Sequence, residues 1–412
     1  MNFPINGIDN INFQFELKVI PIKNNNLFIK FNDLIRTKKE EIDKLENVDN
    51  WDKMKKIGNP YELIYTSYNK KRKNDSISSY IPISRSYFKL WEIFYNFDLF
   101  KDFDSSSKYI FAHLAEGPGG FMEATYNYMK KINKTNNYYY GITLKPTNEY
   151  VPDWNKIKKT FEFDKKVNID YGNLYIYDDV VKYISKFKGN NRATLVTSDG
   201  GFDYSNNFNG QELNSCQIIY SEIVIALNIL DYGGCFIVKV FDLFSITSCQ
   251  MLSLVIENFE KINIYKPETS RPANSEKYLI CQGFKNNLTK EQKSNYLDIL
   301  KEWNNLQLGE DKSVIFNNFK LDNNILYKIN EYNKIYIDKQ LYFLNNTIKI
   351  TQNKPNKDEY YDIIKNQVLQ AIKWCNKYNV TINKNSIYYK KNFSDTYITD
   401  NMDSDLDLDI DI

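Results

Sequence analysis

The sequence predicts an α/β protein built on a doubly wound, mostly parallel sheet. Through the middle of the 412-residue chain, short apolar runs alternate with stretches of helical pattern, which is typical of βαβ units. The runs expected to be strands are Tyr109 to Leu114, Tyr138 to Leu144, Ala193 to Thr197, Gly234 to Val240, Lys261 to Tyr265 and Tyr278 to Gln282. Between two of these runs, apolar residues recur at spacings of three and four, which indicates a helix; they are Ile219, Ile223, Leu227 and Leu230.

The alternation is confined to the central part of the chain, which predicts extensions at both ends. We expect an N-terminal extension (1–75), a central α/β domain (76–288), a C-terminal α+β extension (289–394) and an acidic, disordered tail (395–412). In the C-terminal extension, three short runs between Ile335 and Thr351 predict a small antiparallel sheet. Asp358 to Tyr378 has the pattern of an amphipathic helix.

Composition excludes several classes of protein. The formal charge is +2, from 54 basic and 52 acidic residues, so binding to nucleic acid would need a local patch. The five cysteines form no CxxC pair, and His113 is the only histidine. We therefore expect no metal site and no disulfide framework. No apolar run is long enough to cross a membrane, and no secretory signal is visible. A soluble cytoplasmic protein is expected, with a nuclear location left open.

A glycine-rich turn stands between the first predicted strand and a helical stretch. In LAEGPGGF, Gly117, Gly119 and Gly120 allow a tight bend and the close approach of a ligand to backbone N–H groups, and Pro118 stiffens the bend. The spacing is neither that of the dinucleotide motif nor that of the P-loop, which argues against NAD and against ATP hydrolysis. A purely structural turn and a site for another cofactor both stay open.

Four charged residues attract attention for different reasons. Lys239 interrupts the apolar run CFIVKVF, where an unpaired charge would be costly. Lys89 lies on a helix expected from Tyr80 to Phe97, Asp199 precedes two glycines, and Glu276 lies near a strand end. Taken singly, a solvated lysine, a turn-forming aspartate and a surface acid explain the last three. His113, at the end of the first strand, is expected to be a core residue.

These segments together resemble a known family. HLAEGPGGF is similar to motif I of the FtsJ-like ribose 2′-O-methyltransferases, and GGCFIVKVFDLF with KPETSRPANSEKY resembles the members that act on mRNA caps. The resemblance covers about residues 80–285. It implies a Rossmann-like fold and S-adenosylmethionine as methyl donor, with donor contacts from Gly117, Pro118, Gly119, Gly120, Phe121, Thr143, Asp170 and Asp199. The chain departs from many relatives at His113, where they have an acid, and at Asn173, where they have Asp.

The resemblance also implies a catalytic tetrad of Lys89, Asp199, Lys239 and Glu276. A ribose hydroxyl must be aligned with the methyl group and must lose its proton, and we expect Lys239 to take or steer that proton. Burial and the Lys89 ammonium would lower the pKa of Lys239, whereas Asp199 and Glu276 would raise it. The sequence does not decide between these influences.

The implied substrate is capped mRNA, methylated on the first transcribed nucleotide (cap 0 to cap 1). Because HLAEGPGGF is also similar to relatives that act on the second nucleotide, that position stays open. So do two different functions, that of a ribosomal RNA methyltransferase and that of a non-catalytic RNA-binding scaffold subunit of a capping complex. RNA contacts are expected from Arg85, Arg271 and Ser275, and from the basic run Lys70 to Lys73, although such a run is usually a solvated loop.

The flanks and the composition suggest a setting for this activity. The segments beyond residue 290 could contact a guanylyltransferase or an RNA polymerase, or could simply pack against the central domain. Heavy use of Asn, Lys, Ile and Tyr, with 33 tyrosines, is typical of an AT-rich genome. With a compact core and unfamiliar flanks, it favours a large DNA virus that caps its transcripts in the host cytoplasm.

Overall fold

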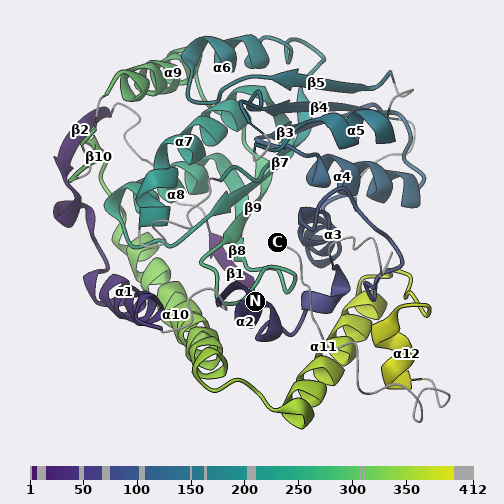
Figure 1. Cartoon of the computed structure of the whole chain (residues 1–412). Coiled ribbons are helices and arrows are strands. Elements are labelled where there is room, and N and C mark those ends of the chain that lie inside the picture. The colour runs from purple at the N-terminus through teal and green to yellow at the C-terminus, as the bar shows by residue number, and fades with distance from the viewer. Residues whose placement is uncertain are drawn as a thin grey trace.

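The computed structural model describes residues 2–6, 15–45, 51–66, 75–101, 107–148, 151–161, 165–201, 210–306, 308–309 and 311–393. Its centre is an eight-stranded sheet in the order β1-β8-β9-β7-β6-β3-β4-β5 (Figure 1). The strands are β1 (Asn2–Asn6), β3 (Tyr109–Leu114), β4 (Asn137–Thr143), β5 (Val167–Tyr171), β6 (Ala193–Ser198), β7 (Leu230–Val240), β8 (Phe259–Tyr265) and β9 (Lys277–Phe284). None of the described helices is long and apolar enough to cross a membrane.

The sheet confirms the predicted doubly wound architecture. Five strands form the parallel part of the sheet, in the order β7, β6, β3, β4, β5, and each is parallel to the next. β9 runs antiparallel between β7 and β8, and β1 extends the sheet antiparallel to β8. All six predicted strands are present within a few residues of their expected bounds. β5 was missed because its residues are only half-buried and lack the apolar run on which the other predictions depended.

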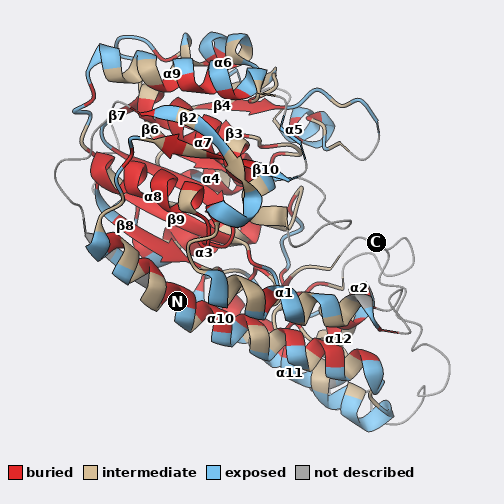
Figure 2. Cartoon of the chain, turned by 90° about the vertical axis from the view of Figure 1, so that its left-hand side faces the viewer, coloured by how far each residue is buried: buried red, intermediate tan, exposed pale blue. Residues whose placement is uncertain are grey.

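Helices cover both faces of the sheet, because alternate residues of each strand point to opposite sides. Ile110 and Ala112 of β3 belong to one core, whereas Phe111 between them belongs to the other. The first core lies under α6 (Tyr177–Ile184), α7 (Gln211–Ile229), α8 (Ile246–Asn258) and α9 (Lys290–Asn305); the second lies under α3 (Ser86–Phe97), α4 (Gly120–Lys131) and α5 (Asn155–Thr160). Figure 2 shows the buried sheet between these layers.

The two extensions pack against the central domain and against each other. β2 (Glu16–Pro21) pairs with β10 (Lys312–Asn317), and α1 (Ile29–Asp43) and α2 (Trp51–Ile57) contact α10 (Asn323–Gln352). η1 (Ile22–Asn25) joins β2 to this region, and η3 (Glu62–Ile64) contacts α11 (Lys357–Lys377), which precedes α12 (Ile387–Phe393). Figure 2 shows α1, α2, α10, α11 and α12 gathered at one end of the molecule.

The antiparallel sheet predicted between Ile335 and Thr351 is wrong, because this stretch belongs to the 30-residue helix α10. Its buried residues recur at helical spacing, among them Ile325, Ile329, Tyr332, Tyr336, Leu344 and Ile348. The β-branched residues of the segment favoured strands locally, and packing against α1, α2 and α8 outweighed that preference. The helix predicted for Asp358 to Tyr378 is confirmed as α11. The acidic tail and the basic run Lys70 to Lys73 lie outside the described residues.

Candidate active site

The candidate site lies where the strand order of the sheet reverses. The chain leaves β3 toward β4 and β5, then returns to β6 on the other side of β3. In open α/β sheets, ligands bind at the carboxyl ends of strands at such a switch point. The glycine turn Glu116–Phe121 follows β3, and Asp199 follows β6, so both predicted features lie at this edge of the sheet.

Lys239 and Asp199 form one of two ion pairs at the site. Lys239, near the end of β7, places its Nζ 3.3 Å from Asp199 Oδ1 and donates a hydrogen bond to the Asp199 backbone oxygen at 2.9 Å. The hydroxyl of Tyr278 donates to Asp199 Oδ1 at 2.7 Å. A Cβ at Gly201 would lie 2.8 Å from Lys239 Nζ, so the glycine after the turn leaves room for the ammonium.

Lys89 and Glu276 form the second pair. Lys89 on α3 places its Nζ 2.8 Å from Glu276 Oε1 and 2.9 Å from Oε2, and the hydroxyl of Ser270 donates to Oε1 at 2.8 Å. Glu276 immediately precedes β9, the antiparallel neighbour of β7, and its carboxylate interacts electrostatically with Lys239. The structure thus brings the four tetrad residues together, although Lys89 and Glu276 are 187 positions apart.

The electrostatics answer the question that the sequence left open about Lys239. Burial alone would lower the pKa of its ammonium, but the carboxylates of Asp199 and Glu276 hold this pKa above its usual value. Burial would likewise raise the pKa of Glu276, but Lys89 and Lys239 lower it to about 2. At neutral pH the site therefore holds a charged lysine and a charged carboxylate. A protonated Lys239 can orient a hydroxyl, but it has no free lone pair to accept a proton.

The glycine turn is stabilised mostly by its own residues. Glu116, buried at the start of the turn, accepts a hydrogen bond from the N–H of Met122 at 2.8 Å, and the N–H of Phe121 also bonds to it. Burial raises the pKa of Glu116 well above its usual range, and Asp199 adds to the rise. Helix starts commonly bind phosphate, but here the chain's own carboxyl group occupies that position.

The donor-side residues expected from the sequence occupy different places. The hydroxyl of Thr143, at the end of β4, accepts a hydrogen bond from the Gly117 N–H at 3.1 Å. Asp170, on β5, is paired with Lys186. Gly117 and Pro118 are partly exposed, whereas Gly119 and Gly120 are buried. The Phe121 ring is fully buried, 5.9 Å from the Tyr278 ring, and packs in the core.

The chemistry of this edge fits S-adenosylmethionine. The donor carries no phosphate. Its binding therefore does not require free N–H groups at the start of α4, where Glu116 already accepts hydrogen bonds. Its sulfonium is positive, and two acids lie at this edge of the parallel strands: Asp199 follows β6, and Asp170 lies near the end of β5. The Asp199 carboxylate is close enough to Glu116 to raise its pKa. The residues that would hold the donor here are Gly117, Pro118, Thr143, Asp170 and Asp199.

His113 matches the expectation of a core residue. It is fully buried on β3, and its Nδ1 lies 2.7 Å from the Thr197 hydroxyl. Burial lowers the pKa of His113 to about 3, so its imidazole is neutral at physiological pH. His113 therefore adds no charge to the site.

The three residues expected to contact RNA are engaged within the protein. Arg85 and Arg271 both bind the carboxylate of Glu62, at 2.8 Å and 2.9 Å. Ser275 is buried and donates to Gln211 Oε1 at 2.7 Å. An RNA contact from these residues stays a prediction, and for Ser275 it would require the side chain to leave a buried hydrogen bond.

Sequence reasoning missed several residues that border the tetrad. Tyr278, on β9 and two residues after Glu276, donates to Asp199; the period of two along an extended chain is the available signal. Lys266 donates to the backbone oxygens of Asn274 at 2.6 Å and of Glu276 at 2.9 Å, and burial lowers its pKa to about 7. Glu222, on α7, lies beneath the turn at Gly200; an acidic residue within an apolar helix is a signal that the sequence contains.

Comparison with known proteins supports this assignment of the fold. Residues 82–284 match the model of a family described as FtsJ-like methyltransferase. The chain is 34% identical over 178 residues to the cap-specific mRNA (nucleoside-2′-O-)-methyltransferase 1 of Trypanosoma brucei brucei (strain 927/4 GUTat10.1), covering 43% of this chain and 47% of that protein. It is 32% identical over 203 residues to the Homo sapiens protein of the same name, covering 46% and 23%.

Among solved structures, the chain is similar to a putative ribosomal RNA methyltransferase from Plasmodium falciparum. The two are 20% identical, with a TM-score of 0.37, over 49% of this chain and 97% of that one. The chain spans about half or less of the length of the two curated relatives.

The fold and the site are those of Rossmann-like methyltransferases that use S-adenosylmethionine as methyl donor. Within this class, residues 82–284 match the family model described as FtsJ-like methyltransferase. The glycine turn, all four tetrad positions and the strands of the eight-stranded sheet fall within that range, except β1, which is supplied by the N-terminal extension.

Proposed function

We propose that this chain is an mRNA cap ribose 2′-O-methyltransferase that acts on the first transcribed nucleotide through Lys89, Asp199, Lys239 and Glu276. The observation that carries the proposal is the meeting of two lysine–carboxylate pairs beside the turn after β3. Relatives that are named for cap-specific 2′-O-methylation support the choice of capped mRNA as substrate.

In this mechanism the chain's residues orient the ribose and control charge on its oxygen. S-adenosylmethionine, when bound, supplies an electrophilic methyl group. Lys239 Nζ, fixed by Asp199, would donate a hydrogen bond to the 2′-oxygen and stabilise the negative charge that develops there as the hydroxyl proton passes to a water molecule. Glu276 fixes Lys89 on the other side. Because both carboxylates keep Lys239 protonated, its role is to steer the hydroxyl and stabilise its oxygen, while alignment supplies much of the rate.

The experiment is a methyl-transfer assay with labelled donor and three short RNAs that begin with m7GpppN, GpppN or a 5′-phosphate. We expect label only on capped RNA, at the ribose of the first nucleotide after digestion. Label at the second nucleotide would move the proposal to that position. Label that is indifferent to the cap would favour a ribosomal RNA substrate, and no label on any RNA would favour a non-catalytic scaffold.

The cellular setting follows from the same proposal. An enzyme of a DNA virus that acts in the host cytoplasm would meet transcripts just capped by a guanylyltransferase, close to an RNA polymerase. Immunofluorescence of the expressed chain, together with co-purification with either enzyme, tests this setting. Retention in the nucleus without either partner would contradict it.

A further inference from the structure

The loop Lys266–Glu276 between β8 and β9, here the acceptor loop, carries Glu276 and Arg271. It contains neither helix nor strand, so its backbone must be positioned by other contacts. Local bonds from Ser270 N–H to Pro267 O and from Asn274 N–H to Arg271 O shape two turns. Within the loop, Lys266 also donates to the backbone oxygens of Asn274 and Glu276, and Ser270 donates to the Glu276 carboxylate. Further contacts come from segments far away in the sequence, and both extensions of the chain take part.

Glu92 on α3 is the first of these contacts. It lies one turn after Lys89, is fully buried, and accepts hydrogen bonds from the N–H of Glu268 at 2.7 Å and from the N–H and hydroxyl of Thr269 at 3.3 and 3.2 Å. The indole N–H of Trp374, on α11, donates to the same carboxylate at 3.0 Å. One buried acid thus joins the helix of Lys89, the acceptor loop and the C-terminal extension.

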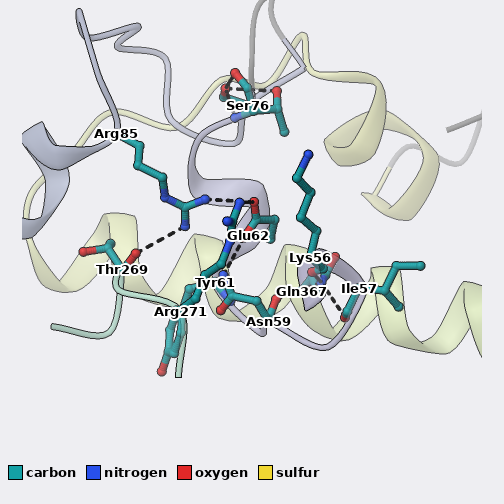
Figure 3. Close-up of polar contacts among 11 residues, drawn as sticks. Lys56, Ile57, Asn59, Tyr61, Glu62, Ser76, Arg85, Thr269, Arg271 and Gln367 are labelled. Atoms are coloured by element: carbon teal, nitrogen blue, oxygen red, sulfur yellow. Dashed lines mark hydrogen bonds and ion pairs between the residues drawn. The ribbon is translucent and has the colours of Figure 1, made fainter. Parts of the chain in front are cut away.

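Glu62, from η3 of the N-terminal extension, is the second contact. It accepts hydrogen bonds from Arg271 Nε at 3.2 Å and Nη2 at 2.9 Å, and from Arg85 Nη1 at 2.8 Å. Arg85 Nη2 also donates to the backbone oxygen of Thr269 at 3.2 Å. Figure 3 shows Glu62 between the two arginines, with Thr269 beside Arg85. Burial would raise the pKa of Glu62, but Arg85 and Arg271 lower it to about 2.

The C-terminal helices complete the support. Gln340, buried on α10, donates to the backbone oxygen of Ala273 at 3.1 Å. Gln367 on α11 donates to the oxygens of Lys56, Ile57 and Asn59 at 3.0, 2.9 and 2.8 Å, which fixes the segment before Glu62 (Figure 3). Side chains of α3, η3 and α10 therefore contact the acceptor loop directly. α11 acts through one residue, because its Trp374 donates to Glu92.

We propose that the N- and C-terminal extensions set the conformation of the acceptor loop, and that Glu92, Glu62 and Gln340 are positioning residues for Glu276. The proposal rests on the function proposed above, because Glu276 is assigned there to the catalytic tetrad. A displacement of about 1 Å in a positioning contact can cost about 10²-fold in rate. The extensions would thus contribute to methyl transfer without touching the reacting atoms.

The test compares two variants of α10 that lose the same kind of bond. Gln340→Leu removes the bond to Ala273 of the acceptor loop, whereas Asn333→Leu removes a 2.9 Å side-chain bond to the backbone oxygen of Leu243, outside the loop. Trp374→Phe, which keeps a ring but removes the donor to Glu92, is the second loop-directed variant. Its control is Trp303→Phe, because Trp303 packs on Tyr220 and Phe316 in the other core.

Hydrogen–deuterium exchange of residues 266–276 is the primary measurement. In Gln340→Leu and Trp374→Phe we expect exchange there to be about tenfold faster, the effect of one lost bond to a buried acceptor or charged group, with no such change in the two controls. The kcat on capped RNA should fall at least about tenfold, while the Kd for the donor stays within about twofold.

The outcomes separate this proposal from the proposed function. Unchanged exchange in the acceptor loop, with melting temperatures lowered as in the controls, would overturn the positioning role. Faster exchange with an unchanged kcat would also overturn it. If the wild-type chain methylates no RNA, the proposed function fails, and exchange still decides whether the extensions hold the loop.

Discussion

The two sides of the candidate site are assembled in different ways. On the donor side, partners are close in sequence: Glu116 bonds Met122 across 6 positions, and Gly117 bonds Thr143 across 26. On the acceptor side, Lys89 and Glu276 are separated by 187 positions, and Arg271 and Glu62 by 209. The donor side is built from backbone groups and glycines within βαβ units, whereas the acceptor side depends on partly buried ion pairs between distant segments.

This difference predicts which property each substitution in the site should change. A change in the donor turn acts on a compact unit and should affect donor affinity and local backbone strain. A change on the acceptor side leaves that unit intact and should act on turnover, because ion-paired side chains there orient the substrate rather than hold the donor. Separate measurements of donor binding and methyl transfer distinguish the two.

The largest expected effect is on the acceptor side. Lys239→Ala removes the ammonium that Asp199 and Glu276 hold in place, and transfer should fall by about 10²- to 10³-fold, the effect of one lost donor to a developing oxyanion. The Kd for the donor should stay within about twofold, as measured by calorimetry with S-adenosylhomocysteine. A variant with ordinary turnover would break the comparison, because the acceptor side would then not depend on its charged pair.

A smaller effect is expected from Gly119→Ala in the donor turn. Gly119 has φ +115°, and a Cβ there would lie 2.5 Å from Ile157 Cδ1, so the change combines backbone strain with a steric clash. We expect a loss of about 1–3 kcal/mol in the free energy of unfolding and a donor Kd raised about tenfold.

Gly189→Ala is the matched control for this variant. Gly189 also has positive φ, +57°, but a Cβ there would meet no atom within 4 Å. It should cost less stability and leave the donor Kd unchanged. Equal effects of the two substitutions on donor affinity would show that the turn acts only through general stability.

The smallest expected effect is on the pH dependence of stability and concerns Glu222. This residue lies beneath the turn at Gly200 and interacts electrostatically with Lys239 and Asp199. Burial raises the pKa of its carboxyl to about 8, although the nearby Ser198 hydroxyl and the charge of Lys239 oppose the rise. Because this folded-state pKa exceeds the ordinary value of 4.5, the stabilising contribution of Glu222 is complete below about pH 4.5 and is lost as pH rises through about 8.

Glu222→Gln should remove this pH dependence, because glutamine stays neutral. Between pH 5 and 8 the wild type should lose free energy of unfolding relative to the variant, by at most about 1.4 kcal/mol per pH unit. Denaturant titrations at four pH values measure the difference. Parallel curves for the two proteins would contradict the assignment of a buried, protonated Glu222 at neutral pH.

The same contrast explains how much the sequence alone could predict. The strands and the glycine turn depend on local patterns, so β3 and the turn Glu116–Phe121 were located directly from periodicity and glycine spacing. The contact of Glu62 with Arg85 and Arg271 has no local signature, and neither has the burial of Glu92. In α10, β-branched residues such as Ile335, Ile337 and Ile348 favour strands locally, and only packing across distant segments shows that they belong to a helix.

The tetrad lies between these extremes. Lys239 was conspicuous because it interrupts a buried strand, but Lys89 and Glu276 were recognised only through resemblance of whole segments to a family. Their ion pair and the raised pKa of Lys239 required the folded chain. The pKa of a buried group depends on the charged groups around it in the folded chain, and the sequence does not show which groups these are.

The central claim is that the two lysine–carboxylate pairs act on one ribose hydroxyl of capped RNA. It is tested most directly with two m7GpppN RNAs that differ only in a single 2′-deoxy sugar, at the first or at the second transcribed nucleotide. The account predicts full labelling of the RNA with the second-position deoxy sugar and none of the RNA with the first-position deoxy sugar. Equal labelling of both RNAs would contradict it, because methyl transfer would then not require the 2′-oxygen of the first transcribed nucleotide.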